Sequence, residues 1–295
     1  MRTESPDWFT RACSTARDEA FVWLDGRRIA YHAWGEPGLP VVVLVHGGAA
    51  HAGWWDHVAP HLAEKCRVLA VDLSGHGESS HEAVYSIERW ADEVIAVAAA
   101  ESADPPILLG HSMGGLVVLA AAARSDVQVR GVAAIDTAAE GTGSGEVGPG
   151  PRPLRTHHRT YETLELAVSR FRTLPIDGAS LPFVRDHLAK TSLRQVPRGW
   201  TWKFDPHIMS KSPVGLVDIR PARCAAAIVR GERGLTTPES AMLMARRVGP
   251  DVPMTTILDA GHHIMLDQPV ALIATLQTLL GQWDLEARTR HGARG

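Results

Sequence analysis

The stretch Gly110-His111-Ser112-Met113-Gly114 constrains the fold of this chain most, because it sets a serine between glycines where an apolar run meets a helical pattern. The apolar run covers residues 106–109 and the helical pattern covers residues 116–124. A serine in so sharp a strand-to-helix turn has a strained backbone, which small neighbouring residues make possible. The turn would expose Ser112 Oγ and direct the Met113 N–H to the place where an oxyanion forms. The alternative is a glycine-rich turn with a solvated serine.

Two apolar runs earlier in the chain have the character of parallel strands buried on both faces. The first, residues 41–45, ends in His46-Gly47-Gly48-Ala49, where Gly48 could provide a second backbone N–H to an oxyanion. The second, residues 67–72, is followed by a turn of small residues at 73–79. Strand-like runs at 129–135, 225–230 and 254–258, with helical spacing at 54–64, 87–101 and 270–280, continue an alternating pattern that predicts a doubly wound, mostly parallel α/β sheet.

Together these motifs resemble the α/β-hydrolase superfamily, whose members carry HG after the third strand, DxxGHGxS after the fourth and GxSxG after the fifth. The resemblance covers about residues 21–283. It implies an α/β-hydrolase fold with a helical cap inserted between strands six and seven. Such a resemblance is specific for the superfamily and weak for any one substrate.

A serine hydroxyl is a poor nucleophile without a base. The run from Gly261 to Pro269 resembles the superfamily's GHxxxxExP loop, with Asp267 in place of the usual glutamate. The resemblance assigns His262, the residue directly after the glycine, as the base, and His263 as its neighbour. The alternative is that both imidazoles are merely packed under the loop.

The acid that orients this base is the point where the sequence departs from the commonest pattern. Most of the superfamily places an aspartate after the seventh strand, where this chain has Gly234. Asp136, at the end of the run 129–135, is the better candidate, because haloalkane dehalogenases, some lactone hydrolases and cofactor-independent dioxygenases of this fold place their acid there. Glu232 is the alternative acid, followed by Asp259 or no acid at all. A strand-end aspartate such as Asp136 can also be a cap or loop anchor.

Aromatic residues in two places could line a substrate pocket. Trp200, Trp202 and Phe204 alternate with polar residues in the expected cap, and Trp54 and Trp55 follow the Gly48 loop. Each set has the alternative of ordinary packing between cap and core. We expect a small-molecule substrate with a hydrophobic acyl or aromatic group.

Composition indicates one soluble enzyme. A chain of 295 residues with 45% hydrophobic content can bury a single large core, and a net charge of −3 predicts neither nucleic-acid nor membrane partners. The first residues carry no apolar leader, and Cys13, Cys66 and Cys224 form no CxxC pair, so the expected compartment is the cytoplasm. No histidine pattern predicts a metal site, and no cofactor is expected; a homodimer is left open.

The expected organisation is an α/β-hydrolase core at residues 1–136 and 221–283, a linker and helical cap at 137–220, and a disordered tail at 284–295. Within the cap, residues 141–153 form the Gly/Pro-rich linker, and 161–171 and 182–190 have helical character.

Three classes of function follow from the sequence. The first is a serine hydrolase of esters, lactones or thioesters, acting through an acyl-enzyme on Ser112. The second is a non-hydrolytic enzyme, such as a cofactor-free dioxygenase, a lyase or an acyl-transferring cyclase, with His262 and Asp136 as a base dyad. The third, a binding protein with a disabled site, is disfavoured by the intact serine and histidine.

Overall fold

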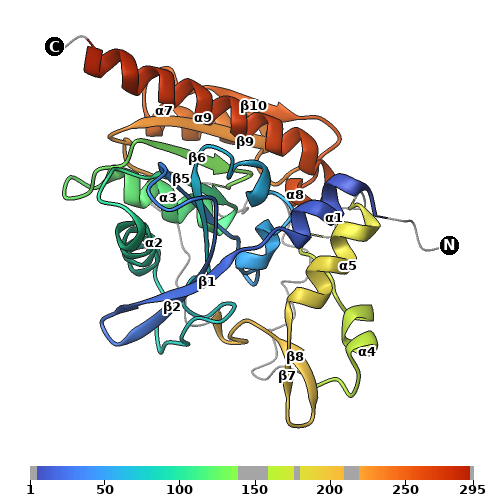
Figure 1. Ribbon diagram of the computed structural model, residues 1–295. Coiled ribbons are helices and arrows are strands. Elements are labelled where there is room, and N and C mark those ends of the chain that lie inside the picture. Colours follow the sequence, from blue (N-terminus) through green and yellow to red (C-terminus); the bar gives the residue numbers. More distant parts are fainter. Residues whose placement is uncertain (1–4, 139–158, 176–179, 209–218, 293–295) are drawn as a thin grey trace.

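A mostly parallel sheet forms the centre of the computed structural model, which describes residues 5–138, 159–175, 180–208 and 219–292 (Figure 1). The order of the eight strands is β1-β2-β4-β3-β5-β6-β9-β10, antiparallel at β1–β2 and β2–β4 and parallel elsewhere. The strands are β1 (Asp18–Leu24), β2 (Arg27–Trp34), β3 (Val41–Val45), β4 (Arg67–Val71), β5 (Ile107–His111), β6 (Gly131–Ile135), β9 (Ala225–Gly231) and β10 (Met254–Ile257).

Helices cover both faces of this sheet. On one face pack α2 (Ile87–Glu101), α3 (Met113–Ala123) and α7 (Pro238–Val248), and on the other α1 (Asp7–Ser14) and α9 (Pro269–Gly292). Every residue of β3 to β6 is therefore buried, which is why these strands appear in the sequence as unbroken apolar runs. The predicted doubly wound α/β architecture is confirmed. Its parallel strands bring the residues that follow β5 and β6 to one edge of the sheet.

A separate group of elements lies between β6 and β9 in the sequence, where the cap was predicted. It contains α4 (Leu164–Ser169), α5 (Pro182–Thr191) and a hairpin of β7 (Leu193–Val196) with β8 (Gly199–Trp202). Figure 1 shows these elements at the lower right, away from α7 and α9. The predicted cap region therefore contains a hairpin as well as helices, because the aromatic residues at 200 and 202 alternate with the period of a strand. The predicted linker at 141–153 lies outside the described residues.

Three further segments differ from the sequence-based expectations. Residues 54–64 form no helix but two 3₁₀ turns, η1 (Ala52–Trp55) and η2 (Ala59–His61), because Pro60 has no N–H to continue a helix. The tail at 284–295, expected to be disordered, is helical to Gly292, since residues that favour helices extend an already formed α9. Helix α1 was not predicted at all.

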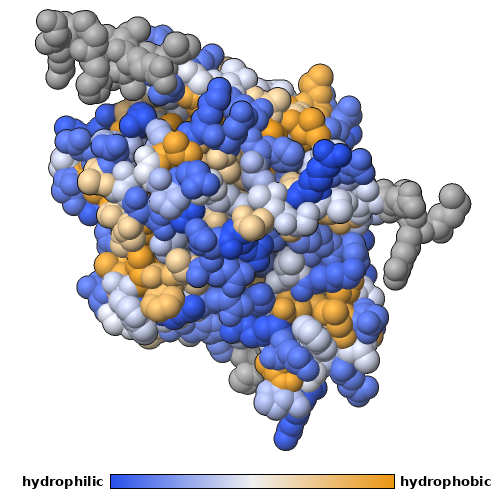
Figure 2. All heavy atoms as spheres, viewed as in Figure 1, coloured by the Kyte–Doolittle hydropathy of each residue, from blue (hydrophilic) through white to orange (hydrophobic). Residues whose placement is uncertain are grey.

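The molecular surface in Figure 2 is largely polar, with apolar residues in separate patches. Within the described part of the chain, no helix combines the length and the apolar character needed to cross a membrane.

Candidate active site

Ser112 lies at the turn between β5 and α3 in a strained conformation, with φ 54° and ψ −120°. The two neighbouring glycines leave the space that this turn requires. A Cβ atom at Gly110 would overlap the carbonyl of Gly114, and a Cβ atom at Gly114 would come within 2.5 Å of the His46 carbonyl oxygen. The Ser112 N–H donates to the Ile135 carbonyl at 2.9 Å, which fixes the turn against the end of β6. The strain expected from the sequence is therefore present at the serine.

Ser112, His262 and Asp136 form a continuous chain of hydrogen bonds. His262 Nε2 lies 3.0 Å from Ser112 Oγ, and His262 Nδ1 lies 2.7 Å from Asp136 Oδ2. Because the Asp136 carboxylate can only accept a hydrogen bond, the proton of His262 is on Nδ1. The lone pair of Nε2 then faces the Ser112 hydroxyl. The His262 side chain is 4% exposed and that of Asp136 is fully buried, so this interaction is little screened by water. The structure thus brings together the three residues that the sequence placed on separate loops.

Asp136 is held by more than the histidine. It has φ 42°, and its N–H donates to the Val229 carbonyl at 2.7 Å. Its carboxylate accepts the N–H groups of Gly231 at 3.1 Å and Leu235 at 2.8 Å, in addition to His262. These donors compensate the burial of the charge and fix the carboxylate in one orientation.

The alternative acids lie elsewhere. Glu232 is exposed, and its Oε2 accepts the Asp259 N–H at 3.0 Å. Asp259 is also exposed and pairs with Arg233 at 3.5 Å. Asp136 is therefore the carboxylate that the structure brings to the histidine, and neither alternative occupies that place.

The loop that carries Gly48 lies against the turn that carries Ser112 and Met113, since a Cβ atom at Gly47 would lie 3.1 Å from Ser112 Cβ. Met113 is the first residue of α3, so its N–H has no acceptor within the helix and lies at the positive end of the helix dipole. Gly48 is exposed, and a Cβ atom there would lie 3.9 Å from Met113 Sδ. Gly48 therefore lies beside the side chain of Met113, the residue that follows Ser112.

The buried His46 fixes the orientation of the Gly48 peptide. Its Nε2 accepts the Leu73 N–H at 3.1 Å, so its proton is on Nδ1, which donates to the Gly47 carbonyl at 2.7 Å. Burial holds the pKa of His46 well below its usual value, which keeps this tautomer neutral. Because the C=O and N–H of one trans peptide point in opposite directions, the Gly48 N–H is directed away from His46.

In a second serine–histidine pair, His51 with Ser192, the hydrogen bond has the opposite direction, because the histidine is the donor. His51 Nδ1 accepts the Gly53 N–H at 3.1 Å, so its Nε2 carries the proton toward Ser192 Oγ at 3.1 Å. The Trp54 Nε1–H points to the same oxygen at 3.4 Å. Ser192 therefore accepts hydrogen bonds and joins α5 to the core, and among the described residues no base faces its hydroxyl.

The aromatic residues proposed for substrate binding divide into two groups. Ring contacts run from His263 to Trp54 at 5.5 Å, from Trp54 to Phe171 at 6.2 Å and from Phe171 to Trp202 at 6.0 Å, and so join the loop of His262 to the elements between β6 and β9. Trp55 is instead fully buried in the core, which favours a packing role. Trp200 is partly exposed and pairs with Gln195 in the hairpin. Phe171 is the member that the sequence analysis missed.

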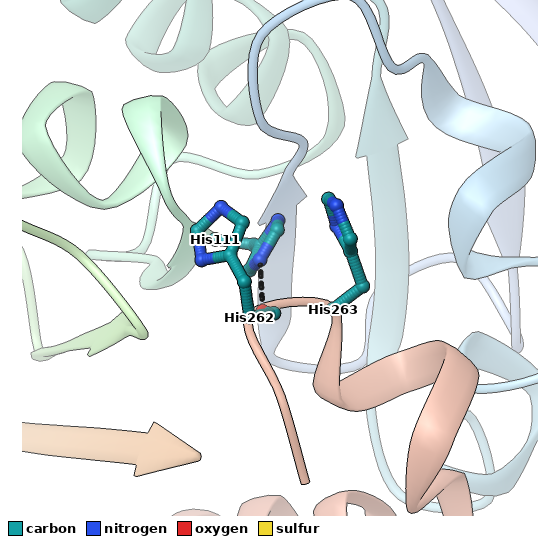
Figure 3. Close-up of side chains that lie close together, drawn as sticks. All are labelled: His111, His262 and His263. Atoms are coloured by element: carbon teal, nitrogen blue, oxygen red, sulfur yellow. Dashed lines mark hydrogen bonds between the residues drawn. The ribbon is translucent and has the colours of Figure 1, made fainter. Parts of the chain in front are cut away.

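Three histidine rings lie together beside the serine: His111, His262 and His263 (Figure 3). One nitrogen from each lies within 4.8 Å of the others, a spacing that a metal site could use. Both nitrogens of His262, however, are already engaged by Asp136 and Ser112. Burial and the neighbouring His262 lower the pKa of His263 to about 3, and burial holds the pKa of His111 well below its usual value, so two neutral imidazoles lie beside His262.

Comparison with known proteins agrees with this geometry. Residues 42–275 match the model of the alpha/beta hydrolase family. The chain belongs to this family.

Its relatives include Lipase LipV of Mycobacterium tuberculosis, 27% identical over 84% of this hydrolase and 96% of the lipase. An esterase of the same organism is 28% identical over 84% of both chains. A monoacylglycerol lipase of Mycolicibacterium smegmatis is 38% identical over a shorter match, which spans 38% of this chain and 43% of that lipase.

Solved structures share the fold of this hydrolase along nearly its whole length. The thioesterase domain from the curacin biosynthetic pathway superposes with a TM-score of 0.73 at 23% identity, over 88% of this chain and 99% of that domain. A hypothetical protein from Pseudomonas aeruginosa PAO1 has a TM-score of 0.73 at 28% identity, over 89% of this chain and 99% of its own.

Proposed function

We propose that this α/β hydrolase cleaves carboxylic esters through an acyl-enzyme on Ser112. The observation that carries the proposal is the hydrogen-bonded chain from Ser112 Oγ through His262 to Asp136, with Nε2 oriented to take the serine proton. Relatives named lipase and esterase, two of them aligned over most of both chains, support ester hydrolysis as the chemistry.

In the first half of the reaction, Ser112 Oγ attacks the ester carbonyl carbon while His262 Nε2 takes the hydroxyl proton. The carbonyl oxygen becomes an oxyanion, which the N–H groups of Gly48 and Met113 stabilise. The C–O bond to the alcohol then breaks, and His262 returns its proton to the leaving oxygen. Asp136 stabilises the transient imidazolium and keeps the ring in place.

In the second half, water attacks the acyl-enzyme while His262 Nε2 accepts a water proton. The same two N–H groups hold the second oxyanion, and collapse of this intermediate releases the carboxylic acid as the proton returns to Ser112 Oγ. Each half uses the same proton acceptor, His262 Nε2, and the same oxyanion site.

The substrate in this proposal is a small molecule with a hydrophobic group. The contacts from His263 through Trp54 and Phe171 to Trp202 place apolar rings between the catalytic loop and the cap, where an acyl or alcohol group would lie. Lactones and thioesters share the same carbonyl chemistry and stay within the proposal. The cytoplasm is kept as the compartment, since Cys13, Cys66 and Cys224 are free thiols.

A fluorophosphonate probe tests the proposal, because it reacts with a serine only where a base activates the hydroxyl. Wild type and Ser192→Ala are expected to be labelled at the same rate, and Ser112→Ala and His262→Ala are expected to remain unlabelled. Ser192 is the matched control because it also bonds to a buried histidine, but as an acceptor. Labelling of Ser112→Ala would refute the proposal and favour chemistry with His262 and Asp136 alone as a base dyad.

A further inference from the structure

His111 contacts the nucleophile turn, the oxyanion loop and the loop of the base. It is the last residue of β5, directly before Ser112, and its ring packs 4.7 Å from the His262 ring. Its Nδ1 lies 3.1 Å from the position of a Cβ atom at Gly47. Only 1% of the residue is exposed. The His111 ring itself takes no part in the hydrogen bonds that run from Ser112 through His262 to Asp136.

One hydrogen bond joins this ring to the base loop. His111 Nε2 lies 2.9 Å from the main-chain carbonyl oxygen of His262, and Figure 3 shows this bond. Because a carbonyl only accepts, the proton of the neutral ring is on Nε2. Nδ1 is then a bare acceptor, buried and without a hydrogen-bond partner among the described residues.

The environment keeps this ring neutral. Burial, and then the nearby His262 and His263, hold the pKa of His111 well below its usual value. A neutral imidazole beside His262 does not repel the positive charge that His262 acquires during catalysis. In this neutral ring the single proton stays on Nε2, where the His262 carbonyl accepts it.

We propose that His111 is a positioning residue, which fixes the base against the nucleophile by donating from Nε2 to the His262 carbonyl. This inference rests on the proposed role of His262 as the base. Ser112 and His262 belong to two separate loops. The His111 hydrogen bond joins the main chain at His262 to the residue directly before Ser112. Loss of this bond lets the base loop shift relative to Ser112 Oγ, and a displacement of about 1 Å can lower a rate about 100-fold.

The substitution His111→Phe isolates the bond, because phenylalanine keeps the ring contact with His262 and removes both nitrogens. The expected result is a fall in kcat of about 10- to 100-fold with KM changed less than about threefold, since the bond affects geometry rather than substrate binding. The melting temperature should change little, because the substitution also removes the bare Nδ1 acceptor. The rate of fluorophosphonate labelling should fall in parallel with kcat.

A second pair of variants keeps the test decisive if His111→Phe does not fold. Glutamine and methionine at residue 111 have similar length and volume, but only glutamine carries an N–H donor. We expect His111→Gln to restore most of the activity that His111→Met loses. Equal activities in this pair, or at least half of the wild-type kcat in His111→Phe, would overturn the inference.

His57 provides a matched control. It is equally buried, and its Nε2 bonds to the Met265 carbonyl at 2.7 Å, three residues beyond His262. His57→Phe likewise removes one bond to a carbonyl together with a bare, buried Nδ1, so its melting temperature should change as little as that of His111→Phe, while kcat stays near wild type. If His57→Phe lowers kcat as much as His111→Phe, general loosening of the loop explains both, and the inference fails. If His262→Ala stays active, the proposed function itself is wrong.

Discussion

The carboxylate of Asp136 occupies the space that a side chain at Gly234 would need. A Cβ atom added to Gly234 would overlap the carboxyl group of Asp136. The φ angle of Gly234 lies outside the left-handed region, so its backbone does not itself require glycine. Asp136 reaches His262 from the end of β6, and its carboxylate lies where a side chain after β9 would be. Only glycine at residue 234 leaves room for it.

The first prediction separates the two candidate acids. Asp136→Asn should lower kcat about 10²- to 10⁴-fold, because an amide at this position favours the wrong tautomer of His262. Glu232→Gln should stay within a few-fold of wild type, since Glu232 bonds to the Asp259 N–H on the surface. Steady-state kinetics at pH 7 measure both, and a near-normal Asp136→Asn beside an inactive Glu232→Gln would reverse the assignment.

A second prediction moves the acid to the other strand. Gly234→Asp alone should destabilise the protein, because its Cβ meets the existing Asp136 carboxylate. Asp136→Ala combined with Gly234→Asp removes this overlap and offers His262 a carboxylate from the loop after β9. We expect this double variant to recover part of the activity that Asp136→Ala loses. Asp136→Asn with Gly234→Asp is the control, and it should recover less, because the asparagine still fills the same space.

The sheet and the hydrogen-bonded Ser112, His262 and Asp136 could be predicted because each lies in or next to a short, recognisable sequence pattern. Strand β3 and helix α2 have the boundaries predicted for them, 41–45 and 87–101, since an unbroken apolar run and a helical period each define one element. Asp136 could be preferred to Glu232 because a glycine stands where the usual acid would be. The elements follow from the residues near each motif, whereas the choice of His262 and Asp136 also needed the resemblance to the α/β-hydrolase superfamily.

The features that could not be predicted depend on contacts distant in the sequence or on competing local preferences. The β7–β8 hairpin has only four residues in each strand, too few for an alternating pattern to be distinguished from a turn. The bond from His111 to the His262 carbonyl joins residues 151 positions apart. Nothing in the sequence around His111 indicates this partner, so only the fold shows it.

The third prediction concerns substrate preference. Wild type should have a higher kcat/KM for uncharged esters with hydrophobic groups than for acetate esters, because apolar rings border the catalytic loop. Trp202→Ala should reduce this preference, since Trp202 contacts Phe171 in the cap. Trp200→Ala is the matched control in the same strand. An equal kcat/KM across acyl chain lengths in wild type would contradict the proposed pocket. A chain-length preference that stays unchanged in Trp202→Ala would also contradict it.

The fourth prediction concerns stability in acid. Burial lowers the pKa of His57 to about 4, and protonation would place a charge on an Nδ1 that has no acceptor among the described residues. An unfolded histidine titrates near its usual value of about 6.5, so below this pH the unfolded chain binds a proton that the folded protein does not. The contribution of neutral, buried His57 to the free energy of unfolding is therefore full above about pH 6.5, and it is lost as the pH decreases toward 4.

Urea unfolding between pH 7 and pH 4 measures this slope. His57 contributes up to about 1.4 kcal/mol per pH unit, and His57→Gln should reduce the slope by this amount while it keeps a donor to the Met265 carbonyl. A slope unchanged in His57→Gln would show that other groups control the acid response.

The turnover of Ser112→Ala on an ester substrate tests the central claim most directly. If Ser112 forms an acyl-enzyme, kcat should fall about 10³-fold or more while the melting temperature changes little. Ser192→Ala, measured beside it, should keep the wild-type rate because its hydroxyl faces a donor rather than a base. Retention of most of the activity in Ser112→Ala would contradict the account and show that the reaction proceeds without a covalent serine intermediate.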